Sequence, residues 1–151
     1  MVLLFAAILA APADCMQPAP WLGTWLQDPS KPVNRFETPA YRKVTLRIAA
    51  ATDGLHVTYD MVRARGGILH MEWTGRFDGQ DYPVQGVDYV LTNAYRIVAD
   101  RSYEIVLKVD GRQVATAVAV VSSDGRTMTV TTTERDGQGR PVESTVVYRR
   151  I

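Results

Sequence analysis

The chain has 151 residues, 46% of them hydrophobic, and a formal net charge of +1. This length is sufficient for one domain with a buried core. Because 17 basic residues nearly balance 16 acidic ones, the composition argues against a nucleic-acid partner and against a polybasic membrane contact.

The N-terminal segment predicts export. Residues 2–11 form a short apolar run that ends in Ala11-Pro12-Ala13, the small-residue pattern at which signal peptides are cleaved. The run is too short for a transmembrane helix, which needs about 20 apolar residues. We expect a signal peptide at 1–13, a flexible linker at 14–20 and one folded domain at 21–151, in a secreted or periplasmic protein.

Cys15 is the only cysteine, so the chain cannot form an internal disulfide. Its position beside the expected cleavage site raises the alternative of a lipid anchor. Lipoprotein signals place a small residue before the cysteine, whereas this chain has Asp14. The sequence therefore favours an unpaired thiol near a frayed terminus over lipidation.

The remaining chain predicts strands and no helix. Trp21–Leu26 is a short aromatic strand candidate, and prolines at 29, 32 and 39 exclude a helix or a central strand from the connection at 27–40. From Tyr41 onward, β-rich runs are separated by Asp-Gly and Gly-Gly pairs, which favour tight hairpin turns. The predicted strands are 21–26, 42–51, 55–64, 68–77, 81–84, 88–98, 102–109, 112–121, 126–134 and 141–150.

Turn positions predict how the first hairpins pair. If Asp53-Gly54 is a two-residue turn, Leu46 lies opposite Met61, and if the next loop has three residues, Tyr59 lies opposite Trp73. Both registers gather the large apolar residues on one face. Since a slip of one residue would invert every side chain, this agreement supports three consecutive antiparallel strands.

A later hairpin extends the same pattern. A turn at Asp110-Gly111 would place Tyr103 opposite Val118, and the following loop would place Val120 opposite Met128. The even-numbered residues of 112–121 are then expected to face the interior. The strands together predict an all-β, antiparallel up-and-down meander that closes into a barrel of eight to ten strands, because closure removes exposed edges.

Four motifs are spread over the predicted domain: Gly23-Thr24-Trp25, the run 77–84, the run 124–133 and the terminal Val147-Tyr-Arg-Arg150. Together they resemble motifs of the lipocalin-like, calycin-type family of small exported bacterial β-barrel proteins. The resemblance implies that Trp25 closes one barrel end beneath Arg149 or Arg150, and that the barrel binds a small hydrophobic molecule. This chain has no disulfide pair, and its ten strand candidates leave a ten-stranded barrel of the fatty-acid-binding-protein type open as well.

The expected inward face supplies the candidate ligand-binding residues. They are Tyr59, Met61, Met71, Trp73, Phe77 and Met128. These side chains would line a pocket for a hydrophobe, or they would fill a solid core, and the sequence does not decide between the two. If a ligand enters, the connection at 27–40 is its expected gate, with an ordinary surface loop as the alternative.

No cofactor, metal or catalytic site is predicted. His56 and His70 fall on the polar face, His70 opposite Val62 with Asp60 and Glu72 nearby, and a surface ladder of mixed charge explains this cluster without a metal ion. The chain has no Gly-x-Ser-x-Gly elbow. We therefore expect a non-catalytic binding protein, with a protein-binding or inhibitory module acting through the outer surface of a filled barrel as the alternative.

Overall fold

The computed structural model describes residues 18–31 and 41–151, which form a closed antiparallel barrel of ten strands. The signal peptide expected at 1–13, Cys15 and most of the expected gate at 27–40 lie outside the described residues. The strands are β1 (Gly23–Gln27), β2 (Tyr41–Ala51), β3 (Gly54–Arg63), β4 (Ile68–Gly75), β5 (Tyr82–Gln85), β6 (Leu91–Ala99), β7 (Ser102–Val109), β8 (Arg112–Val121), β9 (Thr127–Arg135) and β10 (Pro141–Arg150).

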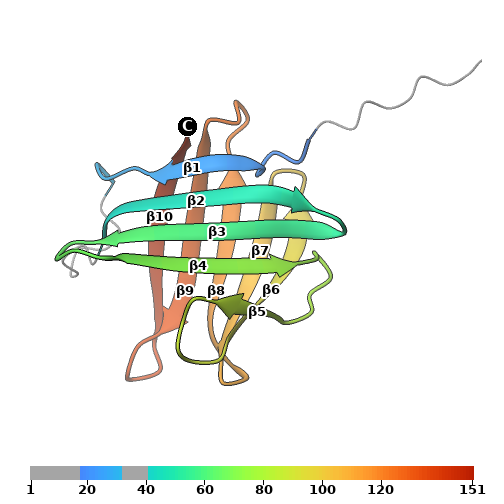
Figure 1. Cartoon of the computed structure of the whole chain (residues 1–151). Coiled ribbons are helices and arrows are strands. Elements are labelled where there is room, and N and C mark those ends of the chain that lie inside the picture. The colour runs from blue at the N-terminus through green and yellow to red at the C-terminus, as the bar shows by residue number, and fades with distance from the viewer. Residues whose placement is uncertain (1–17, 32–40) are drawn as a thin grey trace, which may run out of the picture.

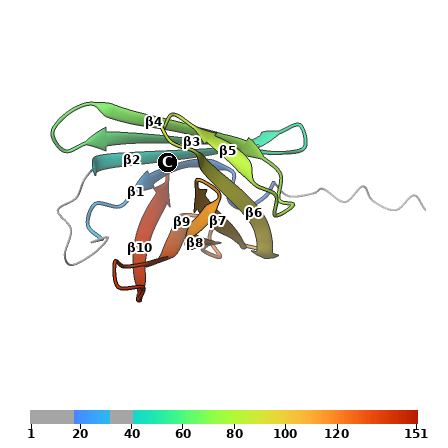
Figure 2. The same ribbon diagram turned by 90° about the horizontal axis from the view of Figure 1, so that it is seen from below.

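Each strand pairs with the next one along the chain, and β1 pairs with β10 to close the sheet. Strands β1–β4 form one layer, and β6–β10 run behind it in a second layer at a steep angle (Figure 1). Seen from below, the two layers lie one above the other (Figure 2). The predicted all-β fold, the meander and its closure are confirmed, and the strand count is ten.

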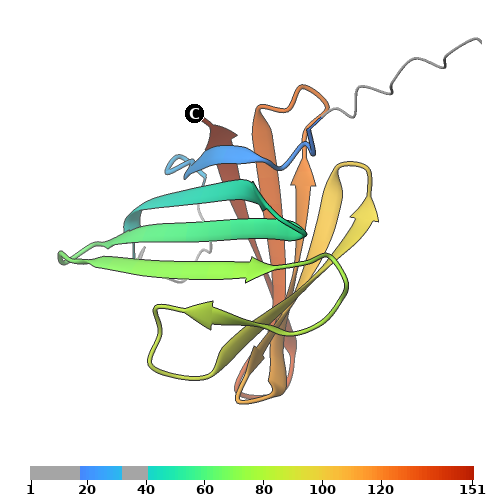
Figure 3. The ribbon, with the colours of Figure 1, turned by 45° about the vertical axis from the view of Figure 1, so that its right-hand side comes forward.

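Strand β5 forms the weakest part of the barrel wall, at the corner where the chain passes between the layers (Figure 3). It pairs with β4 through Glu72 and Trp73 only, and with β6 at Tyr82 and Pro83 only. Pro83 has no N–H to donate to a neighbouring strand, so this strand cannot form a continuous ladder.

The first two hairpins differ from the predicted register by two residues. Leu46 pairs with Tyr59 and not with Met61, because the turn is Thr52-Asp53 and Gly54 already belongs to β3. A Cβ on Gly54 would lie 2.0 Å from the carbonyl oxygen of Gly75, so this glycine serves the close approach of β4.

Tyr59 likewise pairs with Met71 and not with Trp73. The three-residue loop before β4 lies one residue earlier than expected: the Arg63 N–H bonds to the Gly67 carbonyl at 2.9 Å, and Gly66 and Gly67 both adopt positive φ. Shifts of two residues keep every side chain on its expected face, since side chains alternate with period two.

The β7–β8 hairpin corrects the prediction for β8. Asp110 and Gly111 have the positive φ values of a tight turn, 49° and 77°. A bulge between Leu107 and Lys108 then shifts the register by one residue, so that Tyr103 pairs with Ala119 instead of Val118. In the next hairpin, Met128 pairs with Val121 instead of Val120, because four residues instead of three separate the bonded Ser122 and Thr127 in the β8–β9 turn.

The even-numbered residues of β8, predicted to face the interior, therefore face outward. Val114 and Val120 are 45% and 48% exposed, while Ala115, Ala117 and Ala119 are buried. A bulge inserts one extra residue and inverts the alternation beyond it, and nothing in the pattern of Asp-Gly turns signals its presence.

Candidate ligand-binding site

One half of the barrel interior is filled by an aromatic cluster. Trp73 stacks on Tyr95 with ring centroids 4.0 Å apart, and Tyr95 stacks on Tyr103 at 5.5 Å. Phe77 and Trp21 pack edge-on or tilted against these rings at 5.4–6.0 Å. Such offset and edge contacts are the favoured aromatic geometries, so this half is a packed core.

The end of the barrel next to this core is closed by Trp25. Its side chain is fully buried, and its indole N–H donates to the carbonyl of Trp21 at 2.9 Å. The guanidinium of Arg150 lies 4.2 Å from the centre of the Trp25 ring and donates to the carbonyls of Pro20, Leu22 and Gly125. Arg150 therefore covers the tryptophan and ties the segment before β1 and the β8–β9 turn to this end of the barrel.

Arg149 makes a different contact. Its guanidinium pairs with Asp28 at 2.7 Å, and Asp28 is 5% exposed. Hydrogen bonds from the hydroxyl and the N–H of Ser30 are the main causes that lower the pKa of Asp28, and Arg149 adds to them. Of the two arginines considered from sequence, Arg150 is the one that stacks on Trp25.

The other half of the interior is lined by apolar side chains that are only partly buried. Tyr59 and Met61 on β3 and Met71 on β4 face inward beside this half. Their counterparts on β7, β9 and β10 are Leu107, Val130 and Val146, which pack against the core and keep part of their surface exposed. This half is an apolar surface within reach of solvent, which we call the cup.

Strand β8 contributes three alanines to the wall of the barrel, Ala115, Ala117 and Ala119. Because methyl groups stand where the predicted register placed threonine and valine, this wall projects little into the interior. Sequence reasoning missed these residues, and the only signal available was the alternation of alanine with larger residues from 114 to 121.

Tyrosine hydroxyls lie between the filled half and the cup. Burial raises the pKa of Tyr59 to about 12, and a hydrogen bond with Tyr95 acts in the opposite direction. Burial is also the main cause that raises the pKa values of Tyr95, Tyr103 and Tyr148, and each of them interacts electrostatically with Tyr59. The cluster is therefore polar and uncharged at neutral pH.

Asn93 on β6 adjoins this cluster. It is 8% exposed, and its backbone carbonyl accepts the indole N–H of Trp73 at 3.1 Å. Its side-chain oxygen is buried and has no hydrogen-bond partner. Most buried polar atoms in folded proteins are paired, so this atom calls for an explanation.

The structure separates the residues predicted to bind a ligand. Trp73 and Met128, which are 2% and 0% exposed, belong to the filled core. Tyr59, Met61, Met71 and Phe77 are half-buried, and the first three lie beside the cup while Phe77 packs on the aromatic core.

Charged residues occur at the rim of the cup. Arg63 pairs with Tyr41 at the end of β3, and Glu134 pairs with Ala115 at the end of β9. Among the described residues, the inward-facing positions between this rim and Trp25 carry no Lys, Arg, His, Asp or Glu. A charged group placed deep in the cup would therefore have no counter-ion there.

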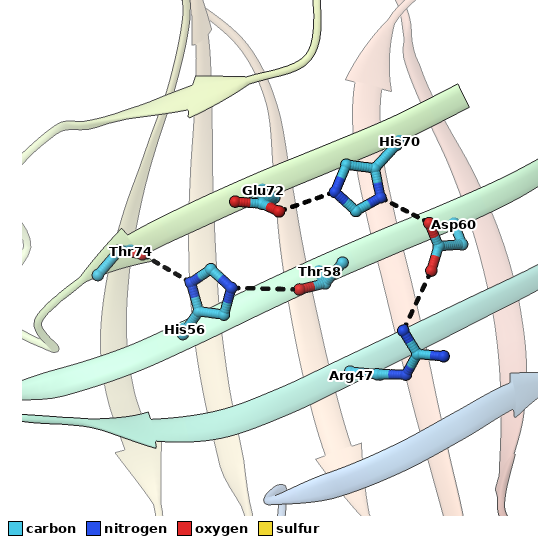
Figure 4. A network of polar contacts seen from close by, with 7 residues as sticks. All are labelled: Arg47, His56, Thr58, Asp60, His70, Glu72 and Thr74. Carbon is cyan, nitrogen blue, oxygen red and sulfur yellow. Dashed lines mark hydrogen bonds and ion pairs between the residues drawn. The ribbon is translucent and has the colours of Figure 1, made fainter. Parts of the chain in front are cut away.

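The polar ladder predicted on the outer face of β2–β4 is present (Figure 4). Arg47 pairs with Asp60 at 3.3 Å, and the two ring nitrogens of His70 contact Asp60 at 2.6 Å and Glu72 at 2.8 Å. His70 lies opposite Asp60 and not Val62, because of the two-residue shift in register. Hydrogen bonds to Asp60 and then to Glu72 raise the pKa of His70.

His56 bonds to the hydroxyls of Thr74, at 2.8 Å, and Thr58, at 3.4 Å. Within residues 18–31 and 41–151, no group of three or more His, Cys, Asp or Glu side chains has the arrangement of a metal site. In the same residues, no helix is long and apolar enough to cross a membrane.

Two concave regions lie near the edges of the barrel. One, of about 590 Å³, is formed by β8, β9 and Pro141; its lining includes the inward-facing Ala115 and Glu134 as well as Val114, Thr116, Thr133 and Arg135. The other, of about 310 Å³, lies at the β2–β3 turn beside Arg76 and Tyr82.

No family model and no curated protein sequence matches this chain. Among solved structures, the chain is similar to a variant of the fluorescent protein UnaG, with 18% identity, a TM-score of 0.59, and coverage of 87% of this chain and 96% of that one. At this identity the likeness concerns the barrel fold.

Two further solved structures align over 87% of this chain with lower TM-scores. Lobster apocrustacyanin A1 has 11% identity, 61% coverage of its own chain and a TM-score of 0.43. The siderocalin Ex-FABP has 15% identity, 71% coverage of its own chain and a TM-score of 0.36.

Proposed function

We propose that this protein binds and carries a small hydrophobic molecule in the cup, without covalent chemistry. The supporting observation is the set of half-buried apolar side chains on the inner wall, with Met61 and Met71 on one side and Leu107, Val130 and Val146 on the other. Methionine adapts its shape to irregular apolar partners, and pockets for small molecules are mostly apolar. The filled aromatic half serves as the floor of such a site.

The test compares inward and outward substitutions on one strand. Ala115→Leu adds volume on the inner wall, and Thr116→Leu adds a similar side chain to the outer face. Titration with the neutral fluorophore N-phenyl-1-naphthylamine should show about tenfold weaker binding to A115L, equivalent to about 1.4 kcal/mol. T116L should bind like the wild type, and equal binding by A115L would exclude the cup.

The second candidate function is a binding or inhibitory module that acts through the outer face of the barrel. The observation that favours it is the concave region of about 590 Å³ beside the exposed Val114. Ala115 borders both sites, so A115L alone does not separate them. In the same titration, Val114→Glu and T116L should both weaken binding of the fluorophore if this region is the site, whereas neither should affect binding in the cup. The two variants therefore distinguish the two proposals.

We further propose that the protein is exported to a secreted or periplasmic location and that residues 1–13 are removed. The apolar run and Ala11-Pro12-Ala13 support this proposal. Intact-mass measurement of the protein from its native source should give a chain that begins at Asp14. A diacylglycerol mass on Cys15 would instead establish the lipid anchor, and an uncleaved chain would refute export by this route.

A further inference from the structure

The unpaired oxygen of Asn93 is the starting point of this inference. The residue is 8% exposed, its backbone carbonyl already accepts the Trp73 indole N–H, and its side-chain oxygen has no partner. A buried acceptor that lacks a donor destabilises the protein unless something else supplies the donor. A polar atom retained in an otherwise apolar wall is thus a candidate contact for a ligand.

Asn93 is connected to the cup through tyrosine hydroxyls. The side chains of Asn93 and Tyr59 both influence the pKa of the buried Tyr95 hydroxyl, so the three polar groups adjoin one another. Tyr59 is half-buried and lies directly opposite Met71 on the neighbouring strand. A molecule that enters the cup would therefore meet the Tyr59 hydroxyl first and the Asn93 amide close behind it.

The polar groups at the inner end of the cup restrict which ligands can bind there. Its groups are hydroxyls and an amide, and burial raises the pKa values of the tyrosines so that they stay protonated. Among the described residues, the charged side chains Arg63 and Glu134 stand at the rim and none faces inward below them. Moving a carboxylate from water to such a site is unfavourable, because no cation compensates for its lost hydration.

We propose that the ligand is an amphiphile whose apolar part lies against the methionines of the cup and whose uncharged hydrogen-bonding group, an alcohol or an amide, reaches Tyr59 and donates to Asn93. This inference rests on the proposed function and deepens it. The site would select neutral amphiphiles over carboxylates of the same chain length.

The test uses 1-decanol and decanoic acid as competitors for N-phenyl-1-naphthylamine at pH 8, where the acid is ionised. Wild-type protein should bind decanol at least about tenfold more tightly than decanoate. Any apolar cavity favours a neutral head to some extent, so the deciding measurement is made on variants. Asn93→Leu and Tyr59→Phe remove the acceptor and the hydroxyl while keeping similar shapes.

For N93L we expect about tenfold weaker binding of decanol and unchanged binding of the fluorophore. Thr92→Val, on the same strand but the outer face, is the matched control and should match the wild type. Thermal unfolding of N93L is measured in parallel, because the substitution removes the unpaired buried oxygen together with the amide group that interacts with Tyr95. If N93L is poorly folded, Tyr59→Phe tests the inference independently, and it should also weaken the binding of decanol.

The outcomes separate the two proposals. If the fluorophore binds but decanoate competes as well as decanol, or if N93L and Y59F both leave the decanol affinity unchanged, the neutral-head inference is wrong and the proposed function stands. If neither the fluorophore nor decanol binds the wild type, the proposed function fails, and this inference fails with it.

Discussion

Arg150 is predicted to be the most important single contact at the closed end of the barrel. Its guanidinium lies over Trp25 and donates to the carbonyls of Pro20, Leu22 and Gly125, so Arg150→Ala removes four interactions. The site is exposed, so we take about 0.5–1 kcal/mol for each carbonyl bond and about 0.5–1 kcal/mol for the cation–π contact. The free energy of unfolding should fall by about 2–4 kcal/mol, which lowers Tm by about 6–16 °C in a domain of this size.

Chemical denaturation followed by tryptophan fluorescence measures this loss. Arg150→Lys keeps the cation over Trp25 but loses the planar fork that reaches several carbonyls, so it should fall between the wild type and R150A. Arg112→Ala, at the β7–β8 turn, is the matched surface control and should change stability by less than about 0.5 kcal/mol. Equal stability of R150A and R112A would refute the role assigned to Arg150.

The remaining predictions concern the wall of the barrel and its outer face. Gly86→Ala should destabilise the protein by more than about 2 kcal/mol, because a Cβ would lie 2.0 Å from the His70 carbonyl oxygen and φ is +99°; Gly137→Ala, which meets no atom within 4 Å, should leave thermal unfolding unchanged. Hydrogen bonds to Asp60 and then to Glu72 raise the pKa of His70. The protonated His70 side chain therefore contributes fully to the free energy of unfolding below the unfolded pKa of about 6.5, and this contribution is lost as the pH rises through the higher pKa of the folded state. His70→Gln should remove that pH dependence, and an NMR titration that places the pKa of His70 below about 6.5 would contradict it.

Local chemistry predicted the architecture well. Glycine-containing turns and period-two alternation in residues 41–150 indicated hairpins, their order and the inward positions of β3 and β4. The two-residue shifts in the first hairpins left the predicted inward and outward faces of β3 and β4 unchanged, because side chains alternate with a period of two residues. The same reasoning failed for β8, where one bulge inverted the inner and outer faces.

The candidate site was only partly accessible from the sequence. Tyr59, Met61 and Met71 could be placed on the inner wall from alternation alone. That Trp73 and Met128 are buried in a packed core, while those three border the cup, depends on how rings from β4, β6 and β7 stack.

The sequence by itself thus determined the strands, their order and most of their faces, since these depend on residues close together in the chain. Only the tertiary structure decided which half of the interior is filled, which arginine covers Trp25, and that the Asn93 oxygen has no donor. The physical reason is that packing and hydrogen bonding inside a closed barrel join residues that are far apart in the chain, and their distances are set by register and by bulges that local patterns do not encode.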